Sequence, residues 1–260
     1  MLDTGISPGR TALNDQQFGP TAALYVQSPV HSAGPDLEQI RDIVGRIPQA
    51  TVLDLGCGGG HVSYFVARVA RAVTACDPSA EMLSAVAAEA ERRGLGNITT
   101  TRAPAEQLPF DDASFDVVVA RHTTHHWPDV RRGIREAARV VKPGGVVVID
   151  DCVAPEVPVL DTFLQTFEML RDPSHVRDYS VSEWSDIAAQ AGLAVTGVTR
   201  RRLPLDFVQW IMRQRVPDVR VEALRDLFAI MPADVRRHFD IRENDDFTID
   251  IALFEMQRAL

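Results

Sequence analysis

The sequence predicts an α/β fold in which a mostly parallel sheet of seven strands is covered by helices on both faces, with helical lid insertions near the C-terminus. Three observations predict this fold. Short apolar segments of strand length alternate with helical patterns from about residue 36 to residue 150, as in βαβ units. These segments are apolar throughout, which is typical of parallel strands buried on both faces. The first of them ends in a glycine-rich turn, where a strand turns sharply into a helix.

The expected elements follow one another in a regular order. Asp36–Ile47 carries its apolar residues on one helical face. The expected strands, which are rich in β-branched and other apolar residues, are Thr51–Leu55, Ala72–Cys76, Asn97–Ala103, Ser114–Ala120, Val146–Asp150, Leu193–Arg202 and Phe247–Met256. The helices expected between the first five strands are His61–Val69, Ala80–Arg93 and Val130–Val141. The last of these helices ends at Lys142-Pro143-Gly144-Gly145, because proline and glycine stop a helix.

We expect one domain with three parts. Residues 1–35 are rich in Gly, Pro, Ser and Gln and form an irregular arm, and residues 36–154 form the core with the glycine-rich turn. Residues 155–260 form the C-terminal part of the same domain, which contains the last strands. The helical stretch 205–240 is too long for a simple connection between strands. We therefore expect it, together with residues 155–192, to form a lid over the site.

Composition and charge exclude several classes of partner. The net charge of -9 argues against a nucleic-acid partner and against an anionic membrane surface, because both require a basic protein surface. No apolar run approaches the roughly 20 residues that a membrane-spanning helix needs, and the N-terminal residues show no secretion signal. Cys57, Cys76 and Cys152 show no paired spacing, which favours reduced thiols in a cytoplasmic enzyme.

The most informative stretch is V-L-D-L-G-C-G-G-G, which ends at Gly60. Gly56, Gly58 and Gly60 allow a tight turn and a close approach of the backbone to a ligand; a turn without a ligand is the alternative. A dinucleotide loop requires G-x-G-x-x-G, and the third glycine is replaced here by His61. The spacing therefore argues against a nicotinamide oxidoreductase.

A second acid lies where a nucleoside would be bound. Ligands of open parallel sheets bind beyond the carboxyl ends of the strands. Asp77 ends the second strand, about 20 residues after the glycine loop, and is placed to accept hydrogen bonds from two ribose hydroxyl groups. The alternative is a surface turn, because the Asp77-Pro78 pair is also typical of the start of a helix.

Four motifs carry a resemblance to a known family. D-x-G-x-G-x-G, which begins at Asp54, resembles motif I of the class I S-adenosylmethionine-dependent methyltransferases. The stretches Ala105–Phe110, His125–Asp129 and Arg139–Gly145 then read A-E-Q-L-P-F, H-H-W-P-D and R-V-V-K-P-G-G. In this order they resemble the ubiquinone and menaquinone biosynthesis methyltransferases, the methyltransferase type 11 family. The resemblance spans roughly residues 50 to 151 and implies a Rossmann-like core that binds S-adenosyl-L-methionine and releases S-adenosyl-L-homocysteine.

The resemblance also implies which residues bind this cofactor. They are Tyr25, Asp54, Gly56, Gly58, Asp77, Pro78, Met82, Ala105, Glu106 and Arg121. Met82 is expected to cover the adenine, with core packing as the alternative. The family carries an acid where this chain has Pro104, so adenine recognition is expected to rest on Ala105 and Glu106. Tyr25 belongs to the arm over the cofactor, where it bonds the cofactor carboxylate, faces the substrate pocket or only anchors the arm.

Histidines are the candidate catalytic residues. His122, His125 and His126 follow the fourth strand, close to where the transferred methyl group is expected. Histidine suits proton removal near neutral pH, and we name His122 and His126 as candidate bases; capping or packing is the alternative. We expect no metal, because neither H-E-x-x-H nor a cysteine pair completes a ligand set.

The stretch R-D-P-S-H-V-R-D, from Arg171 to Asp178, is the second source of candidates. It resembles a stretch of some small-molecule methyltransferases. His175 is a third candidate catalytic residue, and Arg177 a further contact for the acceptor. The alternative is that both residues hold a lid helix in place through salt bridges.

The sequence thus predicts a methyltransferase that acts on a small-molecule acceptor and works as a monomer or homodimer. A polar or heteroaromatic metabolite, including a secondary metabolite, is the expected acceptor, and N-, O- and C-methylation remain open. The alternative is a fold that binds the cofactor but catalyses a different reaction or senses it, because fold alone does not determine function.

Overall fold

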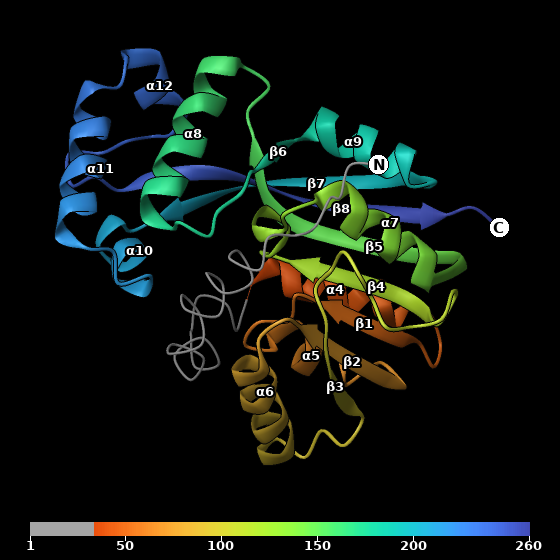
Figure 1. The fold of residues 1–260 in the computed structure, drawn as a ribbon. Coiled ribbons are helices and arrows are strands. Elements are labelled where there is room, and N and C mark those ends of the chain that lie inside the picture. Colours follow the sequence, from red (N-terminus) through yellow and green to blue (C-terminus); the bar gives the residue numbers. More distant parts are fainter. Residues whose placement is uncertain (1–33) are drawn as a thin grey trace, which may run out of the picture.

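The computed structural model describes residues 34–260, and a single sheet organises them (Figure 1). Seven strands lie in the order β3-β2-β1-β4-β5-β8-β7, and the short β6 pairs with β5. Their bounds are Thr51–Leu55 (β1), Ala72–Asp77 (β2), Ile98–Arg102 (β3), Phe115–Arg121 (β4), Val141–Ala154 (β5), Tyr179–Ser180 (β6), Leu193–Leu205 (β7) and Phe247–Arg258 (β8). Only β8 runs antiparallel to its neighbours β5 and β7. The predicted seven-stranded, mostly parallel sheet is confirmed.

The strand order reverses between β1 and β4. From β1 the chain moves outward through β2 to β3, and it then returns to add β4 and β5 on the other side. Helices on the two sides of such a reversal diverge, so that a crevice forms beyond the carboxyl ends of β1 and β4. The topology therefore selects one edge of the sheet for a ligand before any side chain is considered.

Helices cover both faces of the sheet, as predicted (Figure 1). Their bounds are Pro35–Gly45 (α4), His61–Val66 (α5), Ala80–Arg92 (α6), Val130–Val140 (α7), Pro158–Arg171 (α8), Val181–Gln190 (α9), Phe207–Arg213 (α10), Asp218–Ile230 (α11) and Ala233–His238 (α12). Neighbouring residues of a strand point to opposite faces, so Val52 packs in the cluster with α4 and α5, whereas Leu53 packs in the cluster with α7 and α9. The central strands β1 and β4 are mostly apolar because both of their faces are buried, whereas β3 and β7 at the two edges of the sheet carry polar, partly exposed residues.

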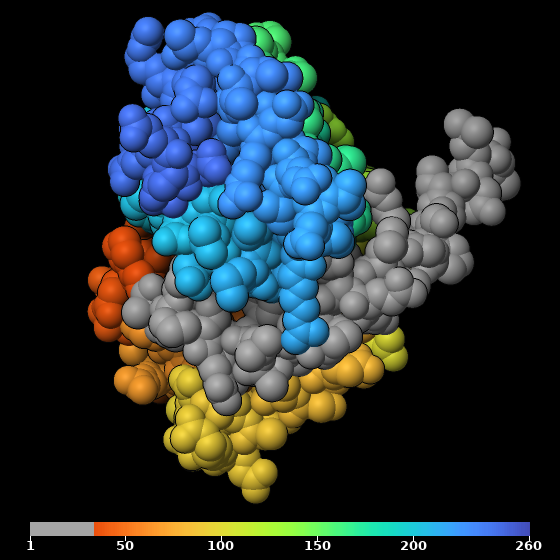
Figure 2. Space-filling view, turned by 90° about the vertical axis from the view of Figure 1, so that its left-hand side faces the viewer, coloured from red at the N-terminus to blue at the C-terminus, as the bar shows by residue number. Residues whose placement is uncertain are grey.

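Four helices form a separate cap at one end of the sheet. Helices α8, α10, α11 and α12 share an apolar cluster with the ends of β5, β7 and β8, and Figure 2 shows the blue segments of this cap gathered at the top of the molecule. Phe167 lies at the centre of the cluster, with its ring 5.3 to 6.1 Å from those of Trp210, Phe228, Phe239 and Phe247. The cap thus has its own aromatic core.

Three features differ from the sequence expectation. Strand β5 begins at Val141, so the K-P-G-G turn belongs to the strand, where the pairing with β4 shifts register. The same strand continues past Asp150 to Ala154, because its end pairs with both β8 and β6. Helix α9, which the lid was expected to include, packs on the sheet through Trp184 and Ile187. The cap therefore consists of α8 and the helices between β7 and β8.

The structure also bears on the expectations for the cysteines and for membrane-spanning helices, but not on those for the N-terminal arm. Cys57, Cys76 and Cys152 are buried and form no disulfide. Between residues 34 and 260, no helix combines the length and the apolar character needed to cross a lipid bilayer. Tyr25 and the rest of the arm up to residue 33 lie outside the described residues.

The aromatic core of the cap predicts a large difference between two positions on α8. Phe167 is fully buried, whereas Met169 is 51% exposed. We expect Phe167→Ala to lower the free energy of unfolding by about 3–5 kcal/mol, because it leaves a cavity among four aromatic rings. Met169→Ala, on the same helix, should change it by no more than about 0.5 kcal/mol. Denaturant unfolding monitored by fluorescence and circular dichroism measures both, and equal losses would contradict the central packing of Phe167 in the aromatic core.

Candidate functional site

A cavity of about 560 Å³ lies beyond the carboxyl ends of β1, β2 and β4. One part, the loop half, is lined by Asp54, Gly56, Gly58, Asp77, Pro78, Met82, Ala105 and Glu106. The other part, the cap half, is lined by Glu168, Arg171, Asp178, Leu203, Leu205, Trp210, Ile249 and Ile251. Between them run residues 121–127, the histidine loop. Every predicted cofactor residue within the described part of the chain lines this cavity.

The glycine loop combines tight packing with open space. Gly56, Gly58 and Gly60 all have positive φ values, of 72°, 46° and 79°, which only glycine adopts without strain. A Cβ atom on Gly56 would lie 2.2 Å from the Oγ1 atom of Thr123, whereas a Cβ atom on Gly58 would meet no atom of the described residues within 4 Å. The loop is therefore packed against the histidine loop at Gly56 and open to the cavity at Gly58.

Two acids, Asp77 and Asp54, hold the glycine loop and the start of the following helix in place through hydrogen bonds. The carboxylate of Asp77 accepts hydrogen bonds from the amides of Gly58 and Ser79, both at 2.9 Å. Asp54 accepts hydrogen bonds from the amide and hydroxyl groups of Ser63, at 2.9 and 2.6 Å, and so anchors the first turn of α5. Burial raises the pKa of Asp54 to about 6. Both acids thus hold backbone while they line the cavity.

The wall opposite the glycine loop comes from α6 and the segment after β3. Met82 on α6 is 2% exposed, and its amide caps the helix by donating to Ser79. Glu106 is equally buried, accepts a hydrogen bond from the amide of Asp129 at 3.2 Å, and has a pKa that burial raises. The wall therefore offers an apolar surface beside a buried carboxyl group.

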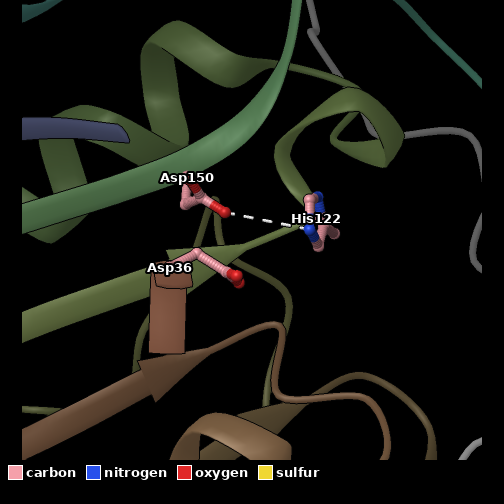
Figure 3. Close-up of side chains that lie close together, drawn as sticks. All are labelled: Asp36, His122 and Asp150. Carbon is pink, nitrogen blue, oxygen red and sulfur yellow. Dashed lines mark ion pairs between the residues drawn. The ribbon is translucent and has the colours of Figure 1, made fainter. Parts of the chain in front are cut away.

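His122 lies beside two buried ion pairs at the end of β4. Figure 3 shows the carboxyl groups of Asp36 and Asp150 directed toward the His122 ring, whose Nε2 atom lies 3.8 Å from the Oδ2 atom of Asp150. Arg121 forms an ion pair with Asp36, and Arg201 forms one with Asp150 at 2.5 Å. Burial, assisted by the charge of Arg121, lowers the pKa of His122 to about 3. The imidazole is therefore uncharged at neutral pH.

His125 differs in charge from its neighbours. Its Nδ1 atom lies 2.7 Å from the Oδ1 atom of Asp151, and Thr124 donates to the other oxygen of Asp151 through its amide and hydroxyl groups. Although burial opposes the charged ring, the carboxylate of Asp151 raises the pKa of His125 to about 9. Burial and the charge of His125 lower the pKa of His126 to about 4. The histidine loop thus holds one charged imidazole between two neutral ones.

The structure does not bring His175 to the cavity. His175 is 2% exposed, is absent from the cavity lining, and its Nε2 atom bonds with the side-chain oxygen of Gln165 on α8. Arg177 forms ion pairs with Asp161 on α8 and with Glu183. These contacts fit the alternative expectation, in which the segment holds α8 in place. The motif alone therefore did not show where His175 lies, because its ring is directed toward Gln165 on α8 and not into the cavity.

Sequence reasoning missed several residues of the cap half. Glu168 on α8, Asp178 before β6 and Arg201 on β7 all line the cavity, although they are far apart in the sequence. Glu168 and Asp178 are 8% and 2% exposed, and burial raises the pKa of both. The one available signal was the R-D-P-S-H-V-R-D stretch, whose last acid, rather than its histidine, reaches the cavity.

Comparisons with known proteins agree with this arrangement. Residues 53–149 match the family model described as a methyltransferase domain. The chain is 41% identical to the uncharacterized protein YafE of Escherichia coli (strain K12) over 204 residues, which are 78% of this chain and 99% of that protein. It is 35% identical to the uncharacterized methyltransferase YcgJ of Bacillus subtilis (strain 168), with 78% of this chain and 81% of that protein covered.

A solved structure and a named enzyme extend the comparison. The crystal structure of Bacillus subtilis YcgJ superimposes with a TM-score of 0.83 at 31% identity, covering 86% of this chain and 98% of that one. A ubiquinone biosynthesis O-methyltransferase of Caulobacter vibrioides is 39% identical over 112 residues, covering 42% of this chain and 44% of that enzyme. The similarity to that enzyme is therefore confined to part of each chain.

The surroundings of Gly56 and Gly58 predict that the same substitution, glycine to alanine, destabilises the protein by different amounts at the two positions. Gly58→Ala should lower the free energy of unfolding by only about 1–2 kcal/mol, the cost of a positive φ, because no atom obstructs the new methyl group. Gly56→Ala should cost roughly 1–3 kcal/mol more, because its Cβ atom overlaps Thr123. Denaturant unfolding of both variants measures the difference. Equal destabilisation would contradict the close packing of Gly56 against the histidine loop.

Proposed function

We infer that this chain, which belongs to the class I S-adenosylmethionine-dependent methyltransferases of the methyltransferase type 11 family, transfers a methyl group from S-adenosyl-L-methionine to a small-molecule acceptor. One observation carries the proposal: within residues 34–260, no atom lies within 4 Å of a Cβ atom built on Gly58, whose amide bonds to the carboxylate of Asp77. A nucleoside bound over Gly58 would meet the backbone without obstruction and an acid that accepts hydrogen bonds from ribose hydroxyl groups.

The lining of the loop half fits the cofactor. In this proposal Asp77 binds the ribose, Pro78 and Met82 cover the adenine, and Ala105 and Glu106 recognise its edge. Each of these groups is buried or tied to backbone, so little conformational entropy would be lost on binding.

The methionine end of the cofactor would lie nearer the sheet. Gly56 and Asp54 lie beneath it, Arg121 faces it from β4, and Tyr25 would cover it from the arm. The bound cofactor supplies an electrophilic methyl group, so the protein mainly has to orient the acceptor and exclude water.

His122 is the proposed proton acceptor for a hydroxyl or amino acceptor. It lines the cavity at the junction of the two halves and is uncharged at neutral pH. The carboxylates of Asp151 and Asp36, which favour the charged ring, would stabilise the imidazolium formed by proton uptake. His126, which lines the same junction and contacts Ser174 at 3.2 Å, is the second candidate. His175 supports α8 and acts only through it.

The cap half indicates the kind of acceptor. Leu203, Leu205, Ile249, Ile251 and Trp210 give it apolar walls, and charged groups lie at its end toward the histidine loop. A compact polar or heteroaromatic metabolite, such as a secondary metabolite, matches this lining, with its methylated atom toward the loop half. The net charge of -9 disfavours nucleic acids. We further propose a cytoplasmic enzyme that acts as a monomer or homodimer.

Cofactor binding tests the proposal directly. S-adenosyl-L-homocysteine, but not NAD, should raise the midpoint of thermal unfolding by several degrees when present at about 100 times its dissociation constant. Asp77→Asn should weaken that binding by roughly 10- to 100-fold, because it removes a charged acceptor of hydrogen bonds. Asp42→Asn, an exposed acid on α4, is the matched control. Stabilisation by NAD alone, or equal binding by the two variants, would overturn the proposal.

Methyl transfer tests the role of His122. Formation of S-adenosyl-L-homocysteine is followed across a panel of hydroxy- and amino-substituted aromatic compounds, and the best acceptor is then used for kinetics. His122→Asn should lower kcat by roughly 10²- to 10⁴-fold, with unchanged calorimetric affinity for S-adenosyl-L-homocysteine. A variant that keeps its kcat would exclude His122 as the base. Binding of the cofactor without turnover on any acceptor would favour a non-transfer role.

A further inference from the structure

A second cluster of side chains lies in the cap half, at its end toward the histidine loop. His125 comes from the histidine loop, Asp151 from β5, and Asp178 from the segment before β6; all three line the cavity. One nitrogen or oxygen atom of each lies within 4.8 Å of the other two. The Nδ1 atom of His125 and the Oδ1 atom of Asp151 are 2.7 Å apart. Three elements thus converge on one point.

One oxygen atom of Asp178 lacks a hydrogen-bond partner. Asp178 is 2% exposed, and its Oδ2 atom is buried without a nitrogen or oxygen donor among the described residues; the thiol of Cys152, a weak donor, also interacts with this carboxyl group. The Nε2 atom of His175 lies 3.9 Å away and is already bonded to Gln165. A buried carboxylate oxygen without a donor is costly and rare in native proteins, and a bound ion is one of the few arrangements that explain it.

The charges around this cluster differ from those around His122. In the group of Asp36, His122 and Asp150 (Figure 3), each acid is directly paired with an arginine, Arg121 or Arg201. That group is therefore already neutralised.

Around His125, by contrast, the charged imidazole is already paired with Asp151, at 2.7 Å. Asp151 and Asp178 are joined by Glu168, which also lines the cavity. The Nη1 atom of Arg171 reaches Glu168 only at 3.7 Å. Among the described residues, Asp178 is therefore the carboxyl group of this cluster without a directly paired cation, since His175 beside it is neutral.

We propose that His125, Asp151 and Asp178 bind one divalent transition-metal ion, with Glu168 as a further carboxylate beside it and with release of the proton that His125 shares with Asp151. One imidazole with two or three carboxylates suits Mn²⁺, Fe²⁺ or Zn²⁺. Ligand atoms on one ion lie at most roughly 4.4 Å apart, so small side-chain rotations bring the present atoms, within 4.8 Å of one another, onto it. Thr124 already orients Asp151, as partners of metal ligands do.

This inference departs from the expectation of no metal and stands independently of methyl transfer. The expectation relied on ligands at fixed spacings, such as H-E-x-x-H. Here residues 125, 151 and 178 meet only through the fold. An ion at this point would lie in the part of the cavity assigned to the acceptor.

Metal binding to the tag-free, full-length chain tests the proposal. The protein is stripped with a chelator and titrated with Mn²⁺, and the free ion is measured by electron paramagnetic resonance; Zn²⁺ is then added as a competitor. We expect one Mn²⁺ per chain, displaced by Zn²⁺. Asp178→Asn preserves the shape of the side chain and should weaken Mn²⁺ binding at least tenfold.

Two control variants locate the site. Asp172→Asn changes an acid that is equally buried in the same segment but does not line the cavity, and it should leave Mn²⁺ binding unchanged. Asp150→Asn changes the group of Asp36, His122 and Asp150, and it should also leave Mn²⁺ binding unchanged. Binding of S-adenosyl-L-homocysteine by each variant reports correct folding.

Three outcomes would overturn the proposal: no stoichiometric binding of Mn²⁺ or Zn²⁺, equal Mn²⁺ affinity in Asp178→Asn and wild type, or loss of binding in Asp150→Asn instead. Stoichiometric Mn²⁺ binding without any binding of S-adenosyl-L-homocysteine would support the metal site and refute only the proposed function.

Discussion

The contact between Gly56 and Thr123 is the constraint on which the site depends. It joins the ends of β1 and β4, the two strands at which the order of the sheet reverses. A side chain at Gly56 would separate these ends, because its Cβ atom would lie 2.2 Å from the hydroxyl of Thr123. The contact seats the glycine loop against the histidine loop. The two halves of the cavity therefore meet at a fixed point, which is a requirement for any reaction between two bound molecules.

Hydrogen bonds extend this fixed point into the cap. Asp151 holds Thr124 and His125, and the carbonyl oxygen of His125 accepts hydrogen bonds from the amides of Val176 and Arg177, at 2.7 and 3.3 Å. The segment that precedes β6 is thus attached to the histidine loop through backbone, while its side chains hold α8. This explains why a stretch with the look of a catalytic motif contributes mainly support.

The sequence predicted what local patterns determine. The glycine loop, the acid at the end of β2 and the alternation of strands and helices are encoded within short windows, so their places were found. The contact between Arg201 and Asp150, which are 51 residues apart, could not be predicted, because no sequence motif of fixed spacing contains both residues. The type of residue alone also misled at His175, since burial against Gln165 turns its ring away from the cavity. The end of β5 was also not predicted, because the strand continues to Ala154 only through its pairing with β8 and β6.

The two halves of the cavity differ in how they are built, and this difference bears on function. The loop half uses backbone amides, a few acids and residues of the strand-to-helix turns, which the sheet itself positions. The cap half lies on strand extensions and on helices with a separate aromatic core around Phe167. Because apolar packing there is largely independent of the sheet core, residues of the cap can change without disturbing the glycine loop. Under the proposed function, the choice of acceptor would therefore depend on the cap and on the ends of β5, β7 and β8 beside it, whereas the turns after β1 and β2 would bind the cofactor.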